Sequence, residues 1–259
     1  MEYFVTNFQA FLLVLIRINA MMMVAPFFSS GVIPLRLKAM LSFLITLVVF
    51  PVLSATTIKV PGTMGLYYLL VLQEVAIGIF IGFLVSIIFS AFQLSGQYYA
   101  AQIGFGINEV YDPLAQVSVP LLGQMKNFIG ILVFLFINGH HFLIEAICRS
   151  FELAPFFGVS KAATGGFLKY IVYAFSGMFI VALKIALPIV AVSFLISVSM
   201  GVLAKAAPQM NIMMLGFPFQ IFGAFLLLII TTPMVIKIMQ VAIERSIKFL
   251  TGVLLHWPG

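Results

Sequence analysis

Long apolar runs dominate this sequence and constrain its fold more than any other feature. Hydrophobic residues make up 63% of the 259 residues and charged residues only 8%. A soluble domain usually carries about 25% charged residues, so this chain lacks the polar side chains that would cover a water-soluble core. These proportions exclude a soluble enzyme, a disordered chain and a disulfide scaffold, and they leave an integral membrane protein.

The apolar runs have the length of membrane-spanning helices. A bilayer core about 30 Å thick requires about 20 apolar residues in helical form. Exposed strands cannot satisfy their backbone in lipid, and a membrane barrel would show short alternating segments. We therefore predict an all-α, multi-pass fold with about six apolar segments at 8–28, 35–53, 66–92, 128–147, 170–200 and 212–243.

The charged residues indicate lipid, not nucleic acid, as a partner. The net charge is +6, but the 13 Lys and Arg residues are scattered singly along the chain. A nucleic-acid-binding face needs such cations clustered, whereas scattered cations in a membrane protein flank the spans near anionic headgroups. The single cysteine, Cys148, permits no disulfide within the chain.

Two of the apolar segments are too long for a simple crossing. A straight helix over 170–200 would be about 46 Å long, and 212–243 is similar. Pro188 and Pro233 lie inside these segments, and each is predicted to kink its helix. Two interpretations remain open: kinked membrane helices, or helices that pack in a large assembly instead of crossing a flat bilayer.

A polar stretch at 93–126 interrupts the apolar pattern. It contains Gly104 and Gly106, which permit unusual backbone conformations, and the turn signal Asp112-Pro113. Pro120 is expected to open the next helix. The stretch is either a solvent-facing loop or a loop folded into a vestibule or pore, and its length and mixed composition favour the second.

No catalytic or metal-binding set is evident. The three histidines are His140, His141 and His256, and Glu145 follows His141 by four residues. A zinc site requires more ligands, so we predict helix-end histidines at an interface. The Gly104-x-Gly106 pair lacks the third glycine and the preceding strand of a dinucleotide loop. We expect no enzyme activity, no metal and no cofactor.

Charged residues inside apolar segments need protein or water around them, because placing one at the bilayer centre costs about 2.5–3.5 kcal/mol. Arg17, Glu74 and Lys184 are such residues. Glu74 is either buried or an interfacial residue at a helix end. We predict that Arg17 or Lys184 pairs with a carboxylate across a subunit boundary. Gly78 and Gly82 form a GxxxG pattern that fits either packing within the chain or a subunit contact.

Several motifs in their order resemble the FliR family, the flagellar member of the FliR/SpaR/YscT group of type III secretion export-gate proteins. The resemblance covers nearly the whole chain, which implies a single domain over 1–259. Gln220 stands where the family motif has a lysine, which is a small departure. The blocks that carry the resemblance are Pro26-Phe27-Phe28-Ser29-Ser30, Glu74-x-x-Ile77-Gly78, Gln102-x-Gly104 through Asp112-Pro113, Asn138-Gly139-His140, Ala207-Pro208-Gln209-Met210-Asn211 and Gly216-Phe217-Pro218.

The resemblance implies a place in the flagellar basal body, in the bacterial inner membrane. Family members form a helical channel with FliP and FliQ for unfolded flagellar export substrates, and FlhA and FlhB complete the apparatus. The family's loop between the third and fourth segments plugs the channel, which corresponds here to 102–120. The residues expected to form the plug are Gly104, Phe105, Gly106, Asn108, Tyr111, Asp112 and Pro113.

Three alternatives remain open at this stage. The first is the same architecture in a virulence injectisome. The second is a small-molecule secondary transporter, although such proteins show internal repeats and this sequence shows none. The third is a structural scaffold that never lines the export path.

Overall fold

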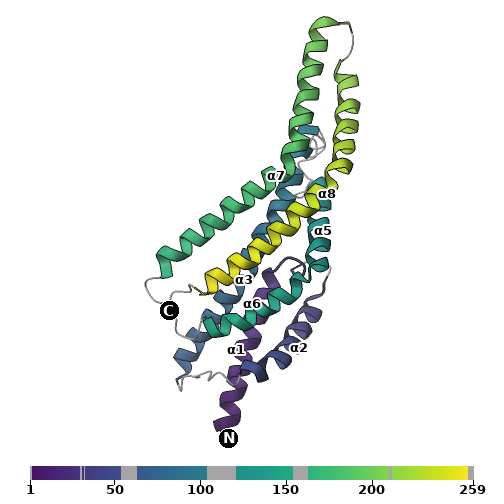
Figure 1. Cartoon of the computed structure of the whole chain (residues 1–259). Helices are drawn as coiled ribbons and strands as arrows, with labels where there is room; N and C mark the ends of the chain where they lie inside the picture. The colour runs from purple at the N-terminus through teal and green to yellow at the C-terminus, as the bar shows by residue number, and fades with distance from the viewer. Residues whose placement is uncertain are drawn as a thin grey trace. The chain divides into compact units, whose positions relative to one another are not determined.

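The computed structural model describes residues 2–29, 31, 33–53, 63–103, 121–153, 163–209 and 212–255. These residues form helices and contain no strand, which confirms the all-α prediction. The helices, labelled in Figure 1, are α1 (Glu2–Val24), α2 (Leu35–Leu53), α3 (Met64–Ile103), α5 (Leu121–Phe136), α6 (Gly139–Leu153), α7 (Ala163–Ala206) and α8 (Ile212–Leu255).

The helices confirm a polytopic membrane protein. Among the described residues, five helices are long and apolar enough to cross a membrane, or six if α5 and α6 together form one span. α3 has 40 residues, and α7 and α8 have 44 each. At 1.5 Å per residue these helices are about 60–66 Å long, roughly twice the thickness of the hydrocarbon core.

The ends of α3 and α5 narrow the polar interruption predicted from the sequence. α3 continues through Gln93 and Gln97 to Ile103, because glutamine and tyrosine side chains do not disturb the helical backbone. α5 begins at Leu121, directly after Pro120. The hydropathy pattern predicts that the third segment ends at residue 92, but the helix ends about three turns later.

The predicted segment 128–147 is not one continuous helix, because it falls on two helices that are bent by 71° relative to each other. Asn138 separates α5 from α6 and has a φ of 58°, a left-handed conformation that asparagine tolerates better than most residues. The N–H of His141 donates to the Asn138 carbonyl at 3.0 Å, which begins α6. Hydropathy does not reveal a break of this kind, because it reports which residues avoid water and not the backbone conformation of a single residue.

The two prolines predicted to kink helices lie inside α7 and α8. Both helices continue past them, and α2 and α8 contain Pro51 and Pro218 in addition. The kinks at Pro188 and Pro233 stay predictions.

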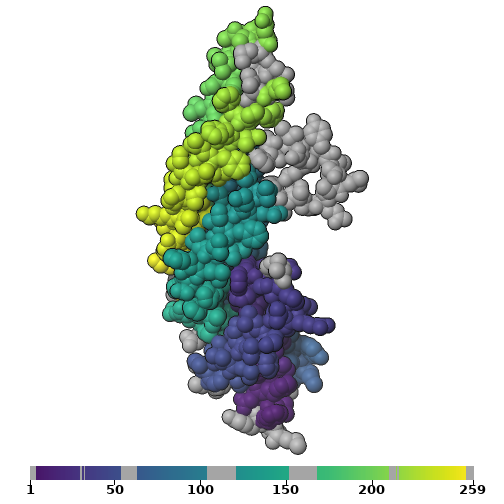
Figure 2. All heavy atoms as spheres, turned by 90° about the vertical axis from the view of Figure 1, so that its right-hand side faces the viewer, coloured from purple at the N-terminus to yellow at the C-terminus, as the bar shows by residue number. Residues whose placement is uncertain are grey.

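The chain divides into two compact units. The first unit comprises 1–88, 138–175 and 243–259, and the second comprises 89–137 and 176–242. In the first unit α1 packs along α2, and α2 contacts α6. Phe11 of α1 stacks edge-on against Phe43 and Phe50 of α2. Figure 2 shows α2, in dark blue, uncovered on its outer side.

The core of the second unit gathers the end of α3 and the start of α5. Its buried members come from α3, α5, α7 and α8, and they are small or apolar except for Tyr99. They are Tyr99, Ala100, Ile103, Leu122, Ala186, Ile189 and Ala224. The two described ends that flank 104–120 therefore lie in one cluster.

Candidate functional site

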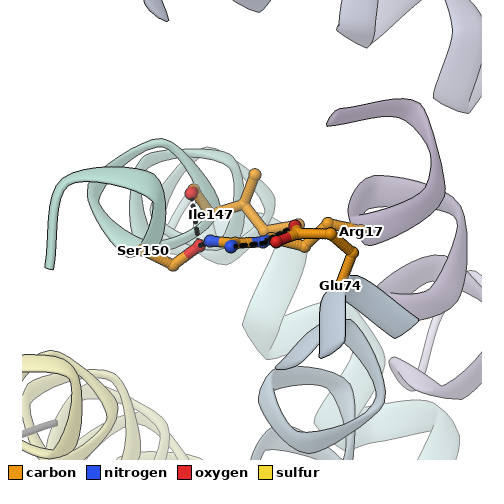
Figure 3. A network of polar contacts seen from close by, with 4 residues as sticks. All are labelled: Arg17, Glu74, Ile147 and Ser150. Atoms are coloured by element: carbon orange, nitrogen blue, oxygen red, sulfur yellow. Dashed lines mark hydrogen bonds and ion pairs between the residues drawn. The ribbon is translucent and has the colours of Figure 1, made fainter. Parts of the chain in front are cut away.

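A buried ion pair joins α1 to α3 in the first unit. Arg17 Nε donates to Glu74 Oε2 at 2.5 Å, and Arg17 Nη2 donates to Glu74 Oε1 at 2.9 Å. Neither residue is exposed. Figure 3 shows the guanidinium and the carboxylate lying edge to edge, which is the two-point geometry that arginine forms best with a carboxylate.

α6 completes the surroundings of Arg17. The third guanidinium nitrogen, Nη1, donates to Ser150 Oγ at 2.9 Å, and that hydroxyl donates in turn to the Ile147 carbonyl at 2.7 Å (Figure 3). The Arg17 Cζ atom lies 3.9 Å from the centroid of the Phe151 ring, close enough for a cation–π interaction. Each nitrogen of the Arg17 guanidinium thus has a hydrogen-bond partner. The guanidinium joins α1, on which it lies, to α3 and α6.

This arrangement corrects one prediction for Arg17. Its carboxylate partner belongs to the same chain, not to a neighbouring subunit. Of the two interpretations of Glu74, the buried one holds, because the side chain is inaccessible. Lys184 is exposed on α7, so a partner for it across a subunit boundary stays a prediction.

The GxxxG pattern brings α3 against α1 beside the ion pair. A Cβ atom on Gly78 would overlap the backbone oxygen of Arg17, and one on Gly82 would lie 2.8 Å from the backbone oxygen of Met21. Of the two interpretations of this pattern, packing within the chain is the one that the structure shows. The absence of side chains at 78 and 82 lets α3 approach α1 closely enough for Glu74 to reach Arg17.

A second polar junction lies in the second unit and was not singled out from the sequence as a contact. The side-chain amide of Gln220 on α8 donates to the Gln102 carbonyl at 2.8 Å and to Ser197 Oγ at 2.9 Å. The Gln102 carbonyl belongs to the last turn of α3, where backbone oxygens lack helical partners. Gln220 therefore joins α8 to α3 and α7.

The residues predicted to form the plug lie outside the described residues. These are the seven positions from Gly104 to Pro113, within 104–120. The described residues locate only the flanks, Ile103 and Leu122, in the core of the second unit.

The histidine pair does not form the cluster required for metal binding. The rings of His140 and His141 lie 4.2 Å apart between centroids. Glu145, four residues beyond His141, forms its ion pair with Arg149 at 2.6 Å. Within the described ranges, no group of three His, Cys, Asp or Glu side chains is placed to hold a metal ion.

Comparison with known proteins places this chain beside flagellar export proteins. The sequence profile of "Bacterial export proteins, family 1" matches residues 8–246. The chain is 29% identical to the flagellar biosynthetic protein FliR of Bacillus subtilis (strain 168), over 98% of each chain. It is 27% identical to FliR of Escherichia coli (strain K12), over 94% of this chain and 92% of the other. It is 30% identical to FliR of Pectobacterium carotovorum subsp. carotovorum, over 78% of this chain and 76% of the other.

Proposed function

Because the chain belongs to the bacterial export proteins, family 1, we propose that it walls a protein-export channel together with FliP and FliQ. The chain is a multi-pass membrane component of the flagellar export apparatus. The proposal adds that it lies in the inner membrane at the flagellar basal body, next to FlhA and FlhB. Unfolded flagellar proteins would pass along the channel, and the chain itself would perform no chemical reaction.

The exposure of α8 is the observation that carries this proposal. In the most apolar 18-residue stretch of Gly216–Leu254, only 11% of the residues are buried within the chain. In the corresponding stretch of Met64–Ile103, 67% of the residues are buried. α8 is about 66 Å long, whereas lipid tails cover about 30 Å of it at most when the helix stands upright. Phe217, Phe222 and Ile229 are among its exposed apolar side chains. The part of α8 that extends beyond the bilayer would expose apolar side chains to water, so other protein chains must cover it.

Copurification tests the shared channel. The tagged chain is expressed with and without FliP and FliQ and is extracted in mild detergent. We expect a stable hetero-oligomer in the first case and an aggregating chain in the second, because the apolar faces of α7 and α8 would lack their cover. A lone chain that is monomeric, monodisperse and stable would contradict the proposal.

We further propose that 104–120 plugs the channel. The support is the location of its flanks, since Ile103 and Leu122 meet in a buried cluster together with residues of α7 and α8. Its composition, with Phe105 and Tyr111 among glycines and amides, suits a seal that can move aside. Deletion of 106–117 is expected to leave the complex assembled but permeable to ions. A deletion complex that stays tight would contradict the plug.

The route of the substrate gives a second test. A photo-crosslinker at position 105 or 111 is expected to capture an export substrate arrested in transit. A crosslinker at Phe136, an exposed residue at the end of α5, serves as a control for proximity without passage. If neither loop position captures the substrate, the chain is a scaffold outside the path.

The relatives named above favour the flagellar branch of the family over a virulence injectisome. The three named above are flagellar biosynthetic proteins. Deletion of the gene is therefore expected to abolish motility. Loss of effector secretion with motility intact would favour the injectisome.

A further inference from the structure

The start of α7 and the end of α8 meet in the first unit through aromatic rings. The ring centroids of Tyr170 and Phe249 are 6.0 Å apart, and those of Tyr173 and Phe249 are 5.1 Å apart. The apolar span of α7 begins at Leu168, and that of α8 ends at Leu254. The contact therefore brings the beginning of one candidate span next to the end of the other, at a level where tyrosine is typical of the membrane–water interface.

Three cations surround this ring contact. Lys169 directly precedes Tyr170, and Lys248 directly precedes Phe249. Arg245 lies one helical turn before Phe249, on the same side of α8. All three cations are exposed. Two packed helices thus present lysine and arginine side chains around one group of rings.

The charge of this surface is not balanced within it. The ranges 168–175 and 243–255 contain these three cations and one carboxylate, Glu244, which gives a net charge of +2. Positive charge next to the headgroup layer attracts anionic lipids, and each lysine or arginine adds to the attraction. The surface therefore has the sign that an anionic headgroup requires.

Apolar side chains continue this surface along α7. Val172 is exposed, and Phe175 is exposed beside Phe83 of α3, with 6.2 Å between the ring centroids. On the opposite side of the contact, Leu250 and Val253 are buried and fix the end of α8 in the protein. The exposed side is therefore basic at one end and apolar at the other, like the two parts of a phospholipid.

We propose that Lys169, Arg245 and Lys248 bind the phosphate of an anionic phospholipid whose acyl chains pack along the start of α7. Ammonium and guanidinium groups form charge-assisted hydrogen bonds with phosphate oxygens. Their long apolar stems can lie along the rings while the charges stay at the level of the headgroups. The site belongs to this chain alone and does not depend on the proposed channel.

Photolabelling tests the site in vesicles. The chain, with any subunits that copurify with it, is reconstituted in phosphatidylcholine vesicles. These carry a photoactivatable acyl-chain analogue of either phosphatidylglycerol or phosphatidylcholine at equal mole fraction, and labelled positions within 168–179 are mapped by mass spectrometry. The test variant is Lys169→Gln/Lys248→Gln. The matched control is Lys205→Gln/Lys237→Gln, which removes one other exposed lysine from each of the same two helices.

We expect the phosphatidylglycerol analogue to label 168–179 of the wild type at least about tenfold more than the phosphatidylcholine analogue. The test variant should lose this preference, and the control should keep it. Unlabelled phosphatidylglycerol should compete, whereas inorganic phosphate at matched ionic strength should not, because it has no acyl chains. The comparison of two headgroups on the wild type does not depend on the folding of a variant.

Four results would overturn the proposal. Equal labelling by the two analogues shows lipid contact without headgroup recognition. An unchanged preference in the test variant places the recognition on other residues. Competition by inorganic phosphate assigns the cations to free phosphate. Absence of labelling, with loss of copurified subunits from the test variant alone, shows that an acidic surface of a partner chain covers the cations.

Discussion

Arg17 and Glu74 are 57 positions apart in the sequence, and the structure encloses both where two hydrogen bonds join them. The pair lies in the first unit, in segments whose composition is membrane-like. A buried pair gains little over an apolar one, but losing one partner is costly because the other charge stays enclosed. The pair therefore fixes the register of α1 on α3.

Charge reversal at either position is expected to be severe. Arg17→Glu or Glu74→Arg places two like charges in a closed space and should destabilise the chain by about 3–5 kcal/mol. The measurement is the apparent melting temperature in detergent. The exchange of both residues should recover only part of the loss, because Phe151 favours a cation at position 17. Full stability of either single variant would contradict a structural role for the pair.

Substitution of Gly78 tests the close approach of α3 to α1. Gly78→Ala should destabilise the chain by about 1–3 kcal/mol, since its methyl group would overlap the Arg17 backbone and push the helices apart. Gly177→Ala is the matched control, because a Cβ there meets nothing within 4 Å. That control should be neutral or stabilising, as alanine favours helix over glycine. Equal effects of the two changes would argue against helix contact at Gly78.

Gln220 should matter for the stability of the second unit. Gln220→Leu leaves the Gln102 carbonyl and the Ser197 hydroxyl without a donor, at a cost of about 1–3 kcal/mol. Ser197→Ala removes one of the two bonds and should cost less. The double variant should lose less than the sum of the single losses, measured by thermal unfolding. Strict additivity would show that the two side chains do not act together.

A lysine at position 220 provides the control for donor chemistry. Its ammonium also donates hydrogen bonds, so Gln220→Lys should retain more stability than Gln220→Leu. If lysine and leucine are equally damaging, the amide acts by shape and not by its bonds.

The sequence predicted those parts of the fold that depend on local composition. The six apolar segments predicted helices, because an apolar segment in lipid must satisfy its backbone N–H and C=O groups internally, and a helix does so. The sequence did not predict that α3 extends to Ile103, because hydropathy indicates which residues avoid water and not which residues are helical. The break at Asn138 was missed because a single left-handed residue leaves no periodic signal.

Contacts between distant positions were the least predictable. Arg17 and Glu74 each stood out as charges in apolar runs, but nothing local indicated that they meet. Ser150 and Phe151 carried no signal at all, because serine and phenylalanine are ordinary residues for a membrane helix. The burial of Lys126 was equally hidden, since the sequence places it beside a polar stretch where exposure is the simpler expectation.

Lys184 offers the last prediction, on assembly. Its side chain is exposed on α7 among Leu183, Leu187 and Phe194, which are also exposed. We predict that a carboxylate of a neighbouring subunit pairs with this cation, because an apolar surface would otherwise leave its charge poorly solvated. Lys184→Glu should reduce the recovery of copurified subunits at least about tenfold, because like charges would then face each other.

Lys184→Arg should keep the recovery near that of the wild type, since the charge is retained. The amount of the chain in the membrane fraction should not change in either variant. Normal recovery from Lys184→Glu would show that Lys184 meets lipid headgroups or water instead of a subunit.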